Sequence, residues 1–83
     1  MSKYSFTFRS VTQAQYALVV LNRYGIGGEL VQAPMEVSEN GCAYAVQVRL
    51  IDGYRAALLL RREGVAYVRV YQTTEHGSEV LVP

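Results

Sequence analysis

The side chain with the most distinctive chemistry in this chain is Cys42, its sole cysteine. It lies between an Asn-Gly turn signal and an alternating run that begins at Tyr44. As a thiolate, a cysteine is a nucleophile that accepts and donates sulfur, whereas a protonated cysteine at a strand start is a small core residue. Glu36 and Glu39 are close in sequence, and no lysine, arginine or histidine is. The residues alone therefore leave both interpretations open.

Two arginines suggest a second kind of site, because each lies at the carboxyl end of a predicted strand. Arg9 precedes Ser10, and Arg49 is followed by Asp52; Ser10 and Asp52 are both candidates to cap a helix. Two guanidinium groups beside two helix N-termini would suit an anion. The alternative is that both arginines solvate strand ends, with Asp52 as an ion-pair partner.

The remaining chemical groups do not form a recognisable catalytic or metal-binding set. His76 is the sole histidine and lies near the C-terminus, and one cysteine with one histidine does not complete a metal site. The glycine-rich stretch 25–28 follows a helix pattern and precedes a strand, which reverses the order of a phosphate-binding loop. We therefore expect no metal, no cofactor and no enzymatic activity.

The elements that position these residues form two similar halves. In the first half, residues 4–8 alternate as a strand with one buried face, and Ser10 with Gln13 forms a capping box. One helical face then collects Ala14, Ala17, Leu18 and Leu21. Gly25 ends this helix, and residues 29–33 form the next strand.

The second half repeats this pattern after a turn-rich connection at 34–41. Residues 44–50 alternate as a strand, and Asp52 begins a helix. One side of that helix is predicted to carry Tyr54, Ala57, Leu58 and Arg61, and the apolar stripe is widened by Ala56, Leu59 and Leu60. Gly64 ends the helix, and residues 66–72 form the last strand.

The order of these elements predicts a fold class. A β-α-β-β-α-β order in residues 1–72 favours a ferredoxin-like α+β domain: a four-stranded antiparallel sheet with two helices on one face. We expect strands one and three to be central, adjacent and parallel, so that Arg9 lies beside Arg49 and both helix C-termini lie at the end of Cys42. Residues 73–83 show no clear period and are predicted to be a tail, with at most a short terminal strand.

Composition limits the class of protein. The chain has 83 residues, 51% of them hydrophobic, and a net charge of +1. Such a chain forms one small domain, and its near-neutral charge argues against nonspecific binding to nucleic acid or membranes. Its apolar runs are too short to cross a bilayer, and one cysteine makes no internal disulfide. We expect a cytoplasmic location.

Several of these residues resemble a family of small bacterial proteins described as selenium/sulfur (Se/S) carrier-like. The resemblance covers residues 4–72 and rests on Phe-Arg-Ser at 8–10, Tyr-Gly-Ile at 24–26, Glu-Leu-Val at 29–31 and the segment 34–45. It implies that Cys42 carries the sulfur or selenium atom, with Pro34, Ser38 and Gly41 in the supporting loop. Met35 and Ala43 stand where the family has arginine and glycine.

The resemblance also implies partners: one protein that donates sulfur or selenium to Cys42 and another that accepts it. A different interpretation is a non-catalytic interaction or ligand-binding module that forms a homodimer through its sheet face. Seven tyrosines are compatible with such a contact surface.

RNA binding is a further alternative with a weaker pattern. Gly41, Ala43 and Tyr44 fit part of the central-strand motif of RNA-recognition domains. The stripe Tyr67, Arg69 and Tyr71 would then line an open sheet face with Gln47 and Arg49. The net charge argues against this function.

Overall fold

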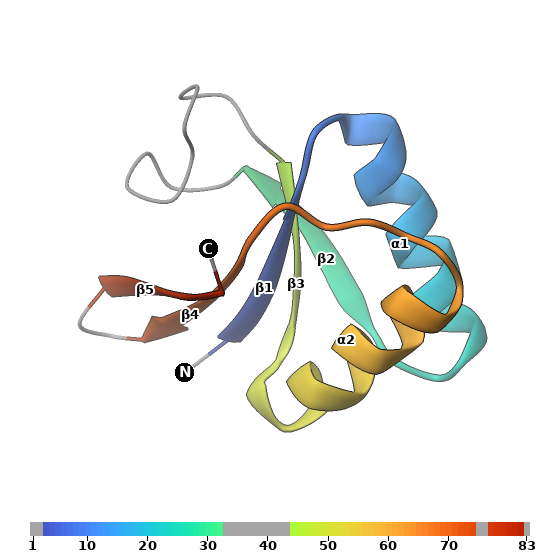
Figure 1. Ribbon diagram of the computed structural model, residues 1–83. Coiled ribbons are helices and arrows are strands. Elements are labelled where there is room, and N and C mark those ends of the chain that lie inside the picture. The colour runs from blue at the N-terminus through green and yellow to red at the C-terminus, as the bar shows by residue number, and fades with distance from the viewer. Residues whose placement is uncertain (1–2, 33–43, 75–76, 83) are drawn as a thin grey trace.

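The computed structural model describes residues 3–32, 44–74 and 77–82. Their elements are β1 (Lys3–Phe8), α1 (Val11–Arg23), β2 (Gly28–Gln32), β3 (Tyr44–Arg49), the 3₁₀ helix η2 (Leu50–Asp52), α2 (Gly53–Arg62), β4 (Val70–Thr74) and β5 (Gly77–Val82). The chain is thus an α+β protein whose first half and second half each contain a helix between two strands (Figure 1).

One antiparallel sheet contains the five described strands in the order β2-β3-β1-β4-β5. The four predicted strands are present, and a fifth, β5, lies in the segment predicted to be a tail and pairs with β4. The predicted alternative of a short terminal strand is therefore the one observed. The boundary between a domain at 1–72 and a tail at 73–83 stays a prediction.

The expected direction of the central strands was wrong. β1 and β3 are adjacent but antiparallel, with Lys3 opposite Arg49 and Phe8 opposite Tyr44. The connection through α1 leaves β1 and β2 pointing the same way, and β3 pairs antiparallel with β2 as well as with β1. Strand β3 therefore runs against both of its neighbours.

The hydrophobic core lies between the sheet and the two helices. Its buried members are Phe6, Phe8, Ala14, Ala17, Val20, Leu21, Ile26, Val46, Val48, Ala56, Leu59, Leu60, Val65 and Val70. Both helices contribute to this one cluster, and they contact each other. A smaller cluster joins Ala45 to Tyr71. Alternate positions of β3 thus belong to different clusters, as the period of two predicts.

The predicted helix boundaries are confirmed where they rest on local chemistry. The Ser10 hydroxyl accepts a hydrogen bond from the backbone N–H of Gln13 at 3.2 Å, so Ser10 is the N-cap of α1. Gly25 follows the C-cap with φ of +82°, a conformation that glycine adopts without steric cost. Gly64 has φ of +73° after α2. Asp52 stands at the N-cap position of α2, but its side chain makes no capping hydrogen bond.

Candidate functional site

The predicted carrier residues lie outside the described residues. Cys42 and the supporting loop residues Pro34, Ser38 and Gly41 all fall within 33–43. The structure resumes at Tyr44, two residues after Cys42 along the chain, where β3 begins with an exposed side chain. Tyr44 is therefore the described residue nearest to Cys42 along the chain.

The start of β3 lies at the same end of the sheet as the start of α1. Tyr44 pairs with Phe8, the last residue of β1, and Phe8 is followed by the exposed Arg9 and the N-cap Ser10. Helix α2 begins instead after the far end of β3, next to Arg49. The two helices thus begin at opposite ends of the sheet, and the expectation that both helix C-termini lie at the end of Cys42 was wrong. The positive N-terminal end of α1 lies there, and residues 64–66, which follow the C-terminus of α2, line a pocket beside it, so one helix C-terminus and not two points toward this end.

The anion site predicted from Arg9 and Arg49 is not formed. Because β1 and β3 are antiparallel, Arg49 pairs with Lys3 while Arg9 lies beyond Phe8 at the other end of β1. Arg9 is six residues beyond Lys3, so in extended chain the two positions lie roughly 20 Å apart. Arg49 uses its guanidinium locally: Nε donates to Asp52 Oδ2 at 3.0 Å. This ion pair is the alternative that the sequence left open.

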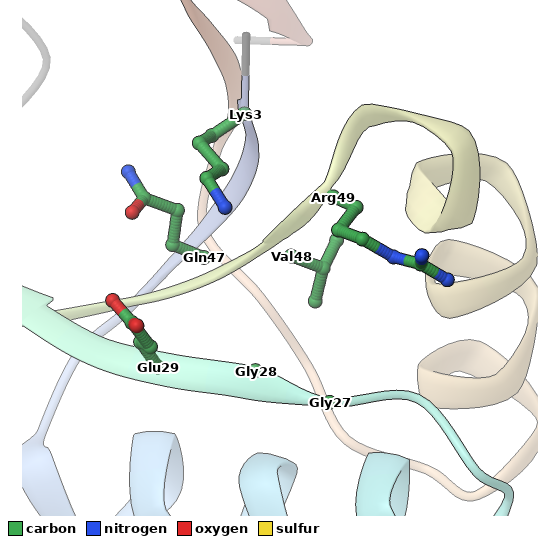
Figure 2. Close-up of a pocket in the computed structure, with 7 residues that line it drawn as sticks. All are labelled: Lys3, Gly27, Gly28, Glu29, Gln47, Val48 and Arg49. Carbon is green, nitrogen blue, oxygen red and sulfur yellow. The ribbon is translucent and has the colours of Figure 1, made fainter. Parts of the chain in front are cut away.

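An open pocket of about 280 Å³ lies at the end of the sheet where Arg49 is found (Figure 2). Strands β1, β2 and β3 and the turn before β2 supply its lining residues, which are Lys3, Gly27, Gly28, Glu29, Gln47, Val48 and Arg49. The Arg49 guanidinium points away from the side chains of Lys3, Glu29 and Gln47 (Figure 2).

The charges around this pocket balance. Lys3 is offset by Glu29, which pairs with Gln47 across β2 and β3, and Arg49 is offset by Asp52. A site for a simple anion needs a surplus of positive charge. The pocket therefore does not replace the predicted anion site, although it is concave and polar. Sequence reasoning missed Lys3, because its place beside Arg49 depends on the antiparallel register.

The two tyrosines of the predicted stripe do not line one open sheet face. The Tyr67 ring packs 5.1 Å from the Phe6 ring against the main core, and Tyr71 is buried in the smaller cluster. Between them, the backbone N–H of Arg69 donates to the Thr7 hydroxyl. Tyr71 is too buried to stack on a nucleic-acid base, and the partly buried Tyr67 belongs to a different cluster, so the two rings do not form one stacking surface.

The described residues contain no cluster of three or more His, Cys, Asp or Glu side chains that could hold a metal ion. His76 lies outside them. None of the helices in the described ranges is long and apolar enough to cross a membrane.

Comparison with known proteins identifies the family. The family model described as "Putative Se/S carrier protein-like" matches residues 3–72, which covers both helices, the first three strands and the first three residues of β4. The chain belongs to this family. No curated protein and no solved structure matches it.

Proposed function

We propose that this protein is a sulfur or selenium carrier and that Cys42 holds the transferred atom. In the sulfur case, the Cys42 thiolate attacks the terminal sulfur of a persulfide on a donor protein. The donor's S–S bond breaks, the donor thiolate leaves, and a persulfide forms on Cys42. An acceptor thiolate repeats the same exchange, so no external oxidant or reductant is needed.

The family match over residues 3–72 carries this proposal, because it includes the sole cysteine. The described geometry adds support from the start of β3. Arg9 and the N-terminus of α1 lie at that end of the sheet, and positive charge of this kind favours a thiolate. The sequence neighbours of Cys42 offer no such cation, so the fold would supply what the local sequence lacks.

We infer that the first four strands and two helices follow the ferredoxin-like plan. The strand order β2-β3-β1-β4 and the single cluster shared by both helices support this inference. We further propose that the protein acts in the cytoplasm as a carrier rather than an enzyme, with separate donor and acceptor proteins as its partners.

Alkylation of the native protein tests whether the thiol is available. Since the chain has one cysteine, iodoacetamide labelling followed by intact mass reports on Cys42 alone. We expect the native chain to react at least as fast as the urea-denatured chain at the same pH. Labelling that occurs only after denaturation would identify Cys42 as a core residue and contradict the carrier function.

Two arginine variants separate the local effect of charge from net charge. Arg9→Gln removes the cation at the N-terminal end of α1, and Arg23→Gln removes an exposed cation at its C-terminal end. We expect Arg9→Gln to slow alkylation by up to roughly fivefold, because one exposed charge interaction is worth about 0.2–1 kcal/mol. Arg23→Gln should leave the rate unchanged. Equal alkylation rates in wild type, Arg9→Gln and Arg23→Gln would show that Arg9 does not favour the Cys42 thiolate.

A further inference from the structure

The outer face of α2 carries large apolar side chains that the core does not use. Ile51 is 83% exposed, Tyr54 76% and Leu58 47%. They follow one another at spacings of three and four residues, so they form one seam along η2 and α2. The opposite face of the same helix buries Ala56, Leu59 and Leu60. Helix α2 therefore has one apolar face in the core and a second apolar face exposed to solvent.

The seam is held in a fixed position by contacts at both sides of α2. Gly53, the first residue of α2, lies so close to the Tyr4 ring that a Cβ there would come within 2.4 Å of it. On the side toward α1, Arg55 donates to the Tyr24 carbonyl at 2.8 Å. Arg62 donates to the Tyr24 hydroxyl at 3.1 Å and stacks 5.3 Å from its ring centroid. A rigid surface of this kind loses little entropy on binding.

Positive charge flanks the seam. Helix α2 contains Arg55, Arg61 and Arg62 and no acidic residue. Two carboxylates lie at its ends: Glu63 is 3.8 Å from Arg62 and also accepts from Tyr24, and Asp52 pairs with Arg49. Arg55 bonds to a neutral carbonyl, and Arg61 has no ion-pair partner among the described residues. The border of the seam is therefore net positive.

We propose that the outer face of α2, defined by Ile51, Tyr54 and Leu58 with Arg55, Arg61 and Arg62 at its border, docks an apolar and acidic segment of a partner protein. Exposed apolar patches with polar borders mark interaction sites, and complementary charge selects the partner. A second copy of this chain would oppose arginines to arginines. A membrane is disfavoured because the seam is short and the chain's net charge is only +1. This docking function does not depend on Cys42.

Photo-crosslinking from the seam tests the proposal. A benzoylphenylalanine placed at Tyr54 in the full chain, expressed in its source cell, is compared with the same probe at the exposed Glu29 of β2. We expect the Tyr54 probe, and not the Glu29 probe, to capture a protein through a segment rich in apolar and acidic residues.

Binding of that purified protein is then measured with two substitutions that leave the core untouched. Ile51→Asp should weaken binding at least about tenfold, the effect of losing one apolar hot spot. Arg61→Glu should weaken it at least about threefold and reduce its dependence on salt. The proposal is overturned if the Tyr54 probe captures no protein, a lipid or a second copy of this chain. It is equally overturned if neither substitution changes the affinity for the captured protein.

Discussion

Tyr4 links the sheet to the start of α2. Its ring lies 5.4 Å from the Phe6 ring and fills the space that Gly53 leaves open. Burial raises the pKa of the Tyr4 phenol above its ordinary value of 10.0, and the nearby Tyr67 adds to the increase in pKa. The folded chain thus holds this proton more tightly than the unfolded chain does.

The stability of the protein should consequently fall at alkaline pH. The contribution of Tyr4 is fully present below pH 10.0, its unfolded pKa, and is lost as the pH rises through the higher folded pKa. Tyr4→Phe should therefore flatten the decline of unfolding free energy above about pH 10. Urea denaturation at several pH values measures this slope. Tyr54→Phe, at an exposed ring, is the control; equal slopes in wild type and Tyr4→Phe would contradict the assignment.

Residue-scale features were predictable where they depend only on residues that are close in sequence. Ser10 as a cap and Gly25 as a helix stop follow from spacings of a few residues. The predicted juxtaposition of Arg9 with Arg49 assumed that β1 and β3 run parallel. This prediction was wrong, because adjacent strands of an antiparallel sheet run in opposite directions, as β1 and β3 do. The reactivity of Cys42 stays a prediction because it lies outside the described residues.

At the scale of elements, α2 shows where periodicity becomes ambiguous. Its apolar residues cover so much of the helix that the pattern predicts an interior place for Tyr54 and Leu58, which are in fact exposed. The contact of Gly53 with Tyr4 helps determine which side faces the core, because only a residue without a side chain allows this approach.

Gly53→Ala should accordingly displace α2. The new Cβ would come within 2.4 to 2.8 Å of three Tyr4 ring atoms, so the helix or the ring must move, at a cost of about 1–3 kcal/mol. Gly27→Ala is the matched control, because a Cβ there meets nothing within 4 Å. Chemical denaturation measures both variants. A Gly53→Ala protein as stable as wild type would show that this contact does not position α2.

At the scale of the whole molecule, the α+β class and the antiparallel sheet follow from the order of the elements. The fifth strand was harder to predict, because residues 77–82 do not alternate in the way that half-buried strands do. Backbone pairing with β4 organises this segment, and that pairing includes an irregularity at Val70 and Tyr71.

A chain that ends at Thr74 tests how far the fold depends on β5. The main core lies entirely within residues 6–70, so we expect the shortened chain to keep its helical circular dichroism and unfold cooperatively. Its denaturation midpoint should fall, since β4 becomes an edge strand that pairs with β1 alone. Loss of the cooperative transition would mean that the family-matched region 3–72 does not fold alone.

The central claim, that this protein carries sulfur or selenium on Cys42, is tested most directly by loading the protein with sulfur. The full chain is incubated with a cysteine desulfurase and free cysteine, and its intact mass is measured beside that of Cys42→Ser. We expect wild type to gain the mass of one sulfur atom, a reductant to remove it, and Cys42→Ser to gain nothing. A folded wild-type protein that gains no sulfur, or a Cys42→Ser protein that gains as much, would contradict the account.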